Sequence, residues 1–133
     1  MILKPDYLTK GNTQWFYFRM SNTRAGKTYR FNIINLLKPD SLYNHGMKPL
    51  LYSEINAKRY NKGWVRCGND VCYFQNQIKR KTFHYYTLTF SCKFDHDYDT
   101  VYWAHSYPYT YSDLRRYLDK IETDPRTKEK FQR

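Results

Sequence analysis

Long apolar runs are missing from this 133-residue sequence. None approaches the roughly 18 residues that a membrane-spanning helix needs, and the polar start at residues 1–6 has no signal-peptide core. Cysteine is scarce as well, because the three cysteines form an odd set that provides no paired disulfide framework. We therefore expect a soluble intracellular protein of one domain, with reduced thiols.

Glycine and proline occur only five times each, which excludes collagen-like and disordered classes. The sequence contains no nucleotide-binding glycine loop, no GxSxG element and no HExxH spacing. Cys67 and Cys72 have CxxxxC spacing without a nearby His, so small buried side chains are the favoured interpretation. The acidic turn at 95–99 lacks the glycine and terminal glutamate of an EF-hand loop, and a solvated turn is favoured over a cation site. The sequence therefore predicts no catalytic or metal site in this chain.

Acidic residues are few: 12 Asp and Glu stand against 23 Lys and Arg, which gives a net charge of +11. Residues 1–94 hold 16 of the basic and 4 of the acidic side chains, a net charge of +12 for that part of the chain. A surface of this charge favours a polyanionic partner such as a nucleic acid, an anionic lipid or an acidic peptide. The alternative is a basic surface that only keeps the protein soluble.

Aromatic residues are abundant at 20%, and from about residue 15 to residue 106 they alternate with polar residues in short runs. Alternation of this kind is typical of strands, which we expect at 15–20, 28–37, 49–53, 82–94 and 100–105. Within the first strand, Phe16, Phe18 and Met20 share one face. The pattern predicts an all-β protein, built as an antiparallel sandwich or a partly open barrel.

A further hairpin is expected between residues 63–67 and 71–74, with Asn69 and Asp70 as its two-residue turn. Such a turn would place Cys67 directly across from Cys72. Basic and aromatic residues are interleaved at 79–86, where bases could stack on tyrosine. Because no RNP-type motif is present, a basic loop that leads into an aromatic core strand is favoured.

The period changes near the end of the chain, where Leu114, Tyr117, Leu118 and Ile121 have the spacing of an amphipathic helix. Ser112 is the expected N-cap, and residues 124–125, Asp-Pro, should end the helix. The preceding residues, 107–112, read Tyr-Pro-Tyr-Thr-Tyr-Ser. They suit either an exposed contact surface or a hydrophobic staple with an N-cap.

Four segments, in order, carry a resemblance to a known family: residues 31–35 (FNIIN), 43–53 (YNHGMKPLLYS), 63–64 (GW) and 107–112 (YPYTYS). The chain resembles the N-terminal domain of the cytosolic carboxypeptidases, zinc enzymes that trim glutamates from tubulin tails and similar acidic termini. The resemblance runs from about Trp15 to Pro125. The approach to the last motif is similar to that of the vertebrate members numbered two and three.

The resemblance implies an antiparallel β-sandwich with one C-terminal helix over 1–125, and a link at 126–133 that leads to an absent catalytic domain. That second domain holds the family's zinc ligands and catalytic glutamate, and no position here matches them. We therefore expect no catalytic residue and no cofactor in this chain, and zinc in the catalytic domain. The parent protein is expected to be a zinc metallocarboxypeptidase. The resemblance further implies a junction near the mouth of the active site, formed by Tyr107, Pro108, Tyr109, Thr110, Tyr111 and Ser112.

The expected role of the chain is to support the catalytic domain and to help acidic substrates reach it. Its expected partners are that catalytic domain and the glutamate-rich tails of tubulin or other proteins, with no membrane and no nucleic acid. The basic residues expected to meet such tails are Arg66, Lys79, Arg80, Lys81, Arg115 and Arg116. The expected location is the cytoplasm, at microtubules or centrioles. The alternative is a stand-alone basic β-domain that binds single-stranded nucleic acid or an acidic protein.

Overall fold

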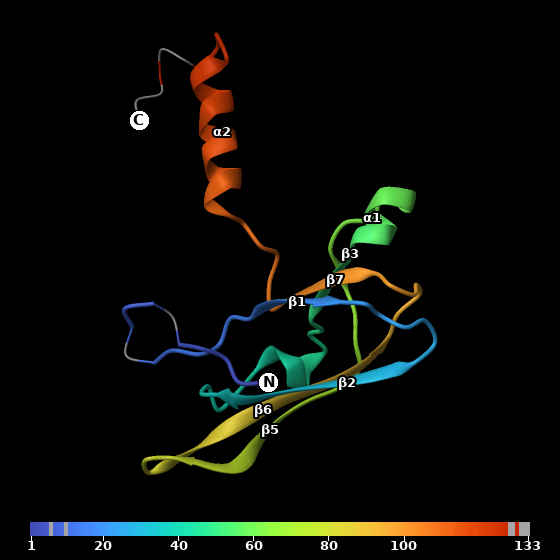
Figure 1. The fold of residues 1–133 in the computed structure, drawn as a ribbon. Coiled ribbons are helices and arrows are strands. Elements are labelled where there is room, and N and C mark those ends of the chain that lie inside the picture. The colour runs from blue at the N-terminus through green and yellow to red at the C-terminus, as the bar shows by residue number, and fades with distance from the viewer. Residues whose placement is uncertain (6, 10, 128–129, 131–133) are drawn as a thin grey trace.

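The computed structural model describes residues 1–5, 7–9, 11–127 and 130 of the chain. Within these residues, seven strands form two antiparallel sheets, with orders β1-β7-β3-β4 and β2-β6-β5 (Figure 1). The strands are β1 (Tyr17–Ser21), β2 (Thr28–Leu36), β3 (Leu50–Ser53), β4 (Val65–Arg66), β5 (Asn69–Arg80), β6 (Phe83–Lys93) and β7 (Thr100–Ala104). The helices are η1 (Leu42–His45, a 3-10 turn), α1 (Glu54–Tyr60) and α2 (Tyr111–Thr123). The predicted antiparallel β-fold with a C-terminal helix is confirmed.

The two sheets share one aromatic core. Trp103 of β7 is fully buried, and its ring lies 5.4 Å from that of Phe31 and 5.0 Å from that of Phe90, measured between ring centroids. Phe31 and Phe90 belong to the other sheet, so these contacts join the sheets. Phe16 is also buried, with Phe18 packed against the same core, as the alternation in the first strand predicts.

The predicted hairpin at 63–74 is wrong. β4 pairs with β3, whereas β5 pairs with β6, so the chain crosses from one sheet to the other between β4 and β5. The crossing occurs at the buried Gly68, whose φ of +132° favours glycine. Cys67 consequently faces Cys92, with 3.7 Å between the Sγ atoms, and Cys72 is exposed. In the long β5–β6 pairing, Tyr73 lies opposite Leu88 and is buried.

The acidic turn after β6 is solvated at Asp95, Asp97 and Tyr98, as the sequence suggests, but its last residue is buried and structural. Asp99 is only 3% exposed, and its carboxylate accepts hydrogen bonds from the Ser53 hydroxyl and from the Ile55 N–H. His96 Nε2 lies 2.8 Å from the side-chain oxygen of Asn56. In the part of the chain that the structure describes, no group of three or more His, Cys, Asp or Glu side chains is placed to hold a metal ion.

Helix α1 was not predicted from the sequence. Ser53 caps its N-terminus by accepting a hydrogen bond from the Asn56 N–H, and Asn61 ends the helix in the left-handed conformation. The Asp99 carboxylate, which bonds both Ser53 and Ile55, fixes this helix to the start of β7. Seven residues are too few for the periodicity of the helix to stand out from the strand pattern around it.

Helix α2 begins two residues earlier than a cap at Ser112 would place it. Thr110 is the N-cap and forms a capping box with Asp113, so the prediction of Ser112 is wrong. The helix ends before Asp124 and Pro125, as predicted. Figure 1 shows α2 standing clear of both sheets, and no residue described within it is buried. No helix among the described residues is long and apolar enough to cross a membrane.

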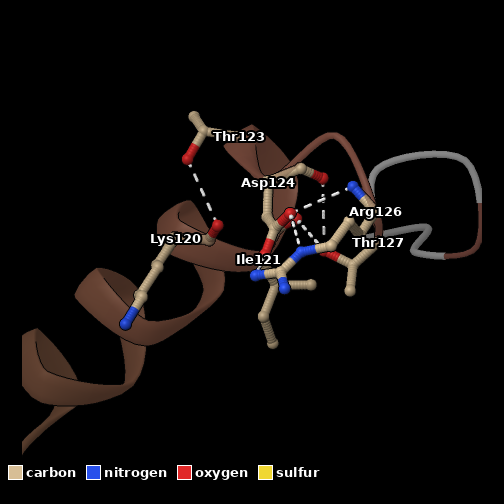
Figure 2. A network of polar contacts seen from close by, with 6 residues as sticks. All are labelled: Lys120, Ile121, Thr123, Asp124, Arg126 and Thr127. Atoms are coloured by element: carbon tan, nitrogen blue, oxygen red, sulfur yellow. Dashed lines mark hydrogen bonds and ion pairs between the residues drawn. The ribbon is translucent and has the colours of Figure 1, made fainter.

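The residues after α2 fold back on its end. Figure 2 shows the Arg126 guanidinium paired with the Asp124 carboxylate, and the Thr127 hydroxyl donating to the Ile121 carbonyl at 2.7 Å. Arg126 therefore belongs to the helix cap, although the sequence places the link from residue 126 onward. Residues 128–129 and 131–133 of that predicted link lie outside the described residues, and the boundary at 125 stays a prediction.

Candidate functional site

Arg66, at the end of β4, joins the two sequence motifs that are far apart in the chain. Its Nη1 atom donates to the carbonyl of Lys48 at 2.6 Å and to the carbonyl of His105 at 3.2 Å. Its guanidinium also lies 5.7 Å from the centre of the Tyr107 ring. Lys48 belongs to the segment at 43–53, and Tyr107 opens the segment at 107–112. The structure thus assembles both motifs around one guanidinium.

A surface hollow of about 520 Å³ adjoins this guanidinium. Met47, Lys48, Arg66 and His105 contribute to its lining. Two permanent cations therefore border a space that is open to solvent. Since Arg and Lys both bind carboxylates, the hollow suits a carboxylate-bearing ligand.

His105 is held in place beneath the junction by two neighbours. Its Nδ1 atom lies 3.0 Å from the Tyr43 hydroxyl, and its ring makes an edge contact with Phe16 at 5.8 Å. Burial, and then the charges of Arg66 and Lys38, lower the pKa of His105 below its usual range. Burial likewise raises the pKa of Tyr43. The histidine is therefore neutral at pH 7, and the charge of the hollow comes from Lys48 and Arg66.

The junction segment at 107–112 is exposed, as one of the two sequence interpretations predicts. Tyr107, Tyr109 and Tyr111 are 62%, 67% and 74% exposed. Thr110 is engaged in the capping box, and the Ser112 carbonyl accepts a hydrogen bond from Arg116. Hydrogen bonds from Thr110 lower the pKa of Asp113, which completes the box. Three large aromatic side chains thus remain available for contact on a short, locally ordered segment.

The six predicted tail-binding residues fall in three separate places. Arg66 lies at the junction, and Arg115 and Arg116 lie in the first half of α2, where Arg116 is paired with Asp113. Lys79, Arg80 and Lys81 lie at the tip of the β5–β6 hairpin, which Figure 1 places at the opposite end of the molecule from α2. The structure therefore brings Arg66 to the junction segment and leaves the hairpin residues far from it.

The rings at 79–86, which a base-stacking platform would need to be free, are partly engaged in packing. Tyr86 stacks on Tyr73 with 5.6 Å between ring centroids and lies against the core. Phe83, at the hairpin tip, is exposed. A basic hairpin that leads into a core strand describes this region better than a row of free aromatic rings.

Sequence reasoning missed Lys48, His105 and Tyr43 as members of the site. Lys48 stands inside the Gly-Met-Lys-Pro-Leu run, so the motif itself was the available signal. His105 precedes the junction segment, and its contact with Tyr43 spans 62 residues of sequence. No local pattern indicates a contact at that separation.

Comparison with known proteins gives consistent results. A family model described as the cytosolic carboxypeptidase N-terminal domain matches residues 2–106. Over 125 residues, the chain is 49% identical to cytosolic carboxypeptidase 3 of Mus musculus and 50% identical to cytosolic carboxypeptidase 2 of Homo sapiens. Each match covers 94% of this chain but only 12% and 14% of the respective relative.

The fold is shared with a solved structure. A crystal structure of a protein from Shewanella denitrificans, assigned as carboxypeptidase A, superposes with a TM-score of 0.59 at 21% identity. The superposition covers 93% of this chain and 27% of that one. Since the family model spans most of the chain and close relatives cover nearly all of it, this chain belongs to the cytosolic carboxypeptidase family, in which it corresponds to the N-terminal domain.

Proposed function

We propose that this chain is the non-catalytic N-terminal domain of a zinc metallocarboxypeptidase that removes glutamates from tubulin tails and other acidic C-termini. In this proposal the two packed sheets form a β-sandwich that supports the catalytic domain. The observation that carries the proposal is the position of Arg66, which bonds the motif at 43–53 and the strand end that leads into the motif at 107–112. A residue so placed fixes the direction in which the chain leaves the sheets.

The exposed side of α2 and the junction tyrosines supply the interface with the catalytic domain. Leu114 and Tyr117 are exposed, although they belong to the apolar stripe of an amphipathic helix. A surface of this kind is usually covered by a partner. The catalytic domain of the same protein is the partner that we propose.

The basic surface concentrates acidic tails near the junction. Residues 1–94 carry a net charge of +12 from 16 basic and 4 acidic side chains. A flexible polyglutamate tail is a polyanion, and such a field raises its local concentration in a salt-dependent way. Next to the junction segment, Lys48 and Arg66 border the hollow that would receive a carboxylate. We place this activity in the cytoplasm, on microtubules or centrioles.

Zinc is assigned to the catalytic domain and not to this chain. The described residues contain no cluster of three or more His, Cys, Asp or Glu side chains that fits a metal ion. In this proposal the residues of this chain contribute support and substrate binding, and the hydrolytic step belongs to the catalytic domain. The purified chain should release no glutamate from a glutamylated peptide, and zinc-dependent release would contradict the assignment.

Binding across a salt series tests the recognition role. The three probes are a polyglutamylated tubulin-tail peptide, an acidic peptide of scrambled sequence and a single-stranded oligonucleotide. Two double variants are compared: Lys48→Gln with Arg66→Gln at the hollow, and the matched Lys79→Gln with Lys81→Gln at the hairpin tip. We expect the hollow variant to weaken binding of the glutamylated peptide by about threefold or more, and the hairpin variant to weaken it less.

The outcomes separate the competing functions. A preference for the glutamylated tail that depends on the hollow supports the proposal. Equal binding of all three probes that vanishes with salt would reduce the charge to a nonspecific field and leave structural support as the main role. A preference for the oligonucleotide would favour the alternative of a basic β-domain that binds single strands.

A further inference from the structure

Two cysteine thiols meet at the point where the chain crosses from one sheet to the other. Cys67 directly follows β4, whereas Cys92 lies near the end of β6 in the other sheet. Their Sγ atoms are 3.7 Å apart, which allows one thiol to donate a hydrogen bond to the other sulfur. We call Cys67 and Cys92 the inter-sheet thiol pair. The third cysteine, Cys72, is exposed on β5 and serves below as a control.

The two thiols of the pair have different surroundings. Cys92 is only 2% exposed, and its Sγ atom also lies 3.3 Å from the Lys93 carbonyl, to which the thiol can donate. Cys67 is half-buried, so a small reagent in solution can reach its sulfur. The pair therefore has one accessible sulfur and one sheltered sulfur.

Hydrogen bonding and charge favour the thiolate form of Cys67. The hydrogen bond from Cys92 is the largest influence, and it lowers the pKa of the Cys67 thiol below its ordinary value. The Gly68 N–H and the Lys48 charge also lower this pKa, while burial and the Asp95 carboxylate oppose the shift without cancelling it. The same hydrogen bond, and then burial, raise the pKa of Cys92. The accessible sulfur is thus the nucleophile, and the sheltered one keeps its proton.

A metal site does not account for the pair. Structural zinc takes four ligands, and no group of three or more His, Cys, Asp or Glu side chains is placed for a metal ion within the described part of the chain. Core packing requires only small side chains at these positions and gives no reason for two sulfurs in hydrogen-bond contact. Two adjacent thiols, one of them nucleophilic, are what a reversible disulfide requires.

We propose that the inter-sheet thiol pair is a redox modification site, at which a peroxide oxidises Cys67 and Cys92 to a disulfide between the two sheets. The Cys67 thiolate attacks the peroxide, so that an S–O bond forms, the O–O bond breaks and the leaving oxygen takes a proton from water. The Cys92 sulfur then attacks Sγ of the resulting sulfenic acid. The S–S bond forms, the S–O bond breaks, and the hydroxyl group leaves as water with the Cys92 proton. The two thiols are oxidised by two electrons, and the peroxide is reduced to an alcohol, or to water, and one further water.

The local structure allows the bond to close. A disulfide is about 2.05 Å long, so the two sulfurs must approach by about 1.7 Å. Gly68, directly after Cys67, has a φ of +132° and can adjust its backbone more freely than other residues. The bond would join positions that are 25 residues apart and would tie the end of β4, including Arg66, to β6. Cytosolic disulfides are usually transient and redox-sensing, which suits the location proposed above.

Oxidation of the fully reduced chain tests the proposal. The chain is treated with a small molar excess of hydrogen peroxide at neutral pH, free thiols are blocked with N-ethylmaleimide, and the peptides are identified by mass spectrometry. We expect the loss of two hydrogens, a linked peptide pair that contains Cys67 and Cys92, and an alkylated Cys72. Dithiothreitol should restore three free thiols. Oxidation should also raise the urea midpoint by about 0.5 M or more, because the bond restricts the unfolded chain.

Matched variants separate the pair from general thiol oxidation. Cys72→Ser should form the same bond to the same extent as the parent. Cys92→Ala should form no bond, its Cys67 should be trapped by dimedone as sulfenic acid, and peroxide should leave its urea midpoint unchanged. In the parent unfolded by urea, the shorter loop should instead favour a bond between Cys67 and Cys72.

Three results would overturn the proposal. They are a bond between Cys67 and Cys72 in the folded parent, dimers linked through Cys72 as the main product, and three alkylated thiols after peroxide treatment. Each result is read on the parent chain, so the conclusion does not depend on the folding of a variant. The measurement uses no acidic peptide, and its failure is therefore distinct from failure of the acidic-tail proposal.

Discussion

The two sheets and helix α2 are stabilised in different ways. The sheets bury a continuous aromatic core around Trp103, with both layers contributing rings. Helix α2 has no buried residue among those described, and it relies on the capping box at Thr110 and the hydrogen-bonded turn after Asp124. The sheets therefore provide their own burial, whereas the described residues of α2 bury no face within this chain.

The largest expected effect is the loss of stability when a side chain of the aromatic core is removed. Trp103→Ala should lower the free energy of unfolding by about 3–5 kcal/mol, because a fully buried indole is replaced by a cavity. The matched change in the helix, Leu118→Ala, should cost less than about 0.5 kcal/mol in this chain. Urea unfolding followed by near-UV circular dichroism measures both changes. Similar losses for the two variants would show that α2 packs on the sheets in solution.

The next largest effect is the loss of stability when Arg66, which lies between the sheets and the segment that leads to α2, is removed. Arg66→Ala should lower the free energy of unfolding by about 1–2 kcal/mol, because the carbonyls of Lys48 and His105 lose a charged donor. Arg115→Ala, an equally charged change on α2, should lie within about 0.5 kcal/mol of the parent. Urea unfolding at matched salt compares them. An Arg66 variant as stable as the parent would mean that the guanidinium does not hold the junction.

The capping box can be broken without touching the sheets. Thr110→Ala should destabilise α2 by about 1 kcal/mol and reduce the far-UV helical signal, with no change in the urea midpoint of the core. Ser112→Ala is the matched control, and its helical signal should stay near that of the parent. A larger loss of helical signal in Ser112→Ala than in Thr110→Ala would show that Ser112 is the N-cap, as the sequence predicts.

The box should also weaken in acid. The folded-state pKa of Asp113 lies below its ordinary value of 3.8, because hydrogen bonds from Thr110 favour the carboxylate. Its contribution is therefore present above that value and lost as the pH falls through the lower folded-state pKa. The helical signal of the parent should fall there, and that of Asp113→Asn should fall less. If the helical signal fell equally with pH in both chains, protonation of Asp113 would not be the cause of the loss.

The smallest expected effect is a pH dependence of the folding stability of the two sheets. The pKa of His105 is lowered from 6.5 in the folded protein, chiefly by burial, so the unfolded chain binds the proton more readily. Stability should be complete above pH 6.5 and should decline as the pH falls toward the lower folded-state pKa. His105→Asn should flatten this decline below about pH 6.5. Parallel pH profiles for the parent and the variant would contradict the prediction.

The strand pattern was predictable because its cause is local. Phe16, Phe18 and Met20 alternate with polar residues, and alternation directly reports one buried face. The spacing of Leu114 and Ile121 identified α2 for the same reason. The hairpin predicted around a two-residue turn at 69–70 does not form, because the long pairing of β5 with β6 outweighs the local turn propensity.

The functional surfaces were less predictable because they depend on distant contacts. Arg66 was identified as basic and accessible, but its bonds reach Lys48 and His105 across 18 and 39 residues of sequence. The junction tyrosines were identified from an unusual run, which is a local signal. The ring contacts of Tyr102 with Tyr17 and Tyr52 likewise join three strands, and they exist only once the strand order is known.

The strand order also has a consequence for synthesis on the ribosome. β1 pairs with β7, from Tyr17 opposite Ala104 to Ser21 opposite Thr100. The first strand therefore has no pairing partner until the last strand has been synthesised. Such long-range pairing slows folding and leaves early strands exposed to wrong partners. Because Ala104 is followed almost at once by the junction at 107–112, the sheets can close just as that segment emerges. In the proposed arrangement, a catalytic domain synthesised after the junction would meet two sheets that have already formed.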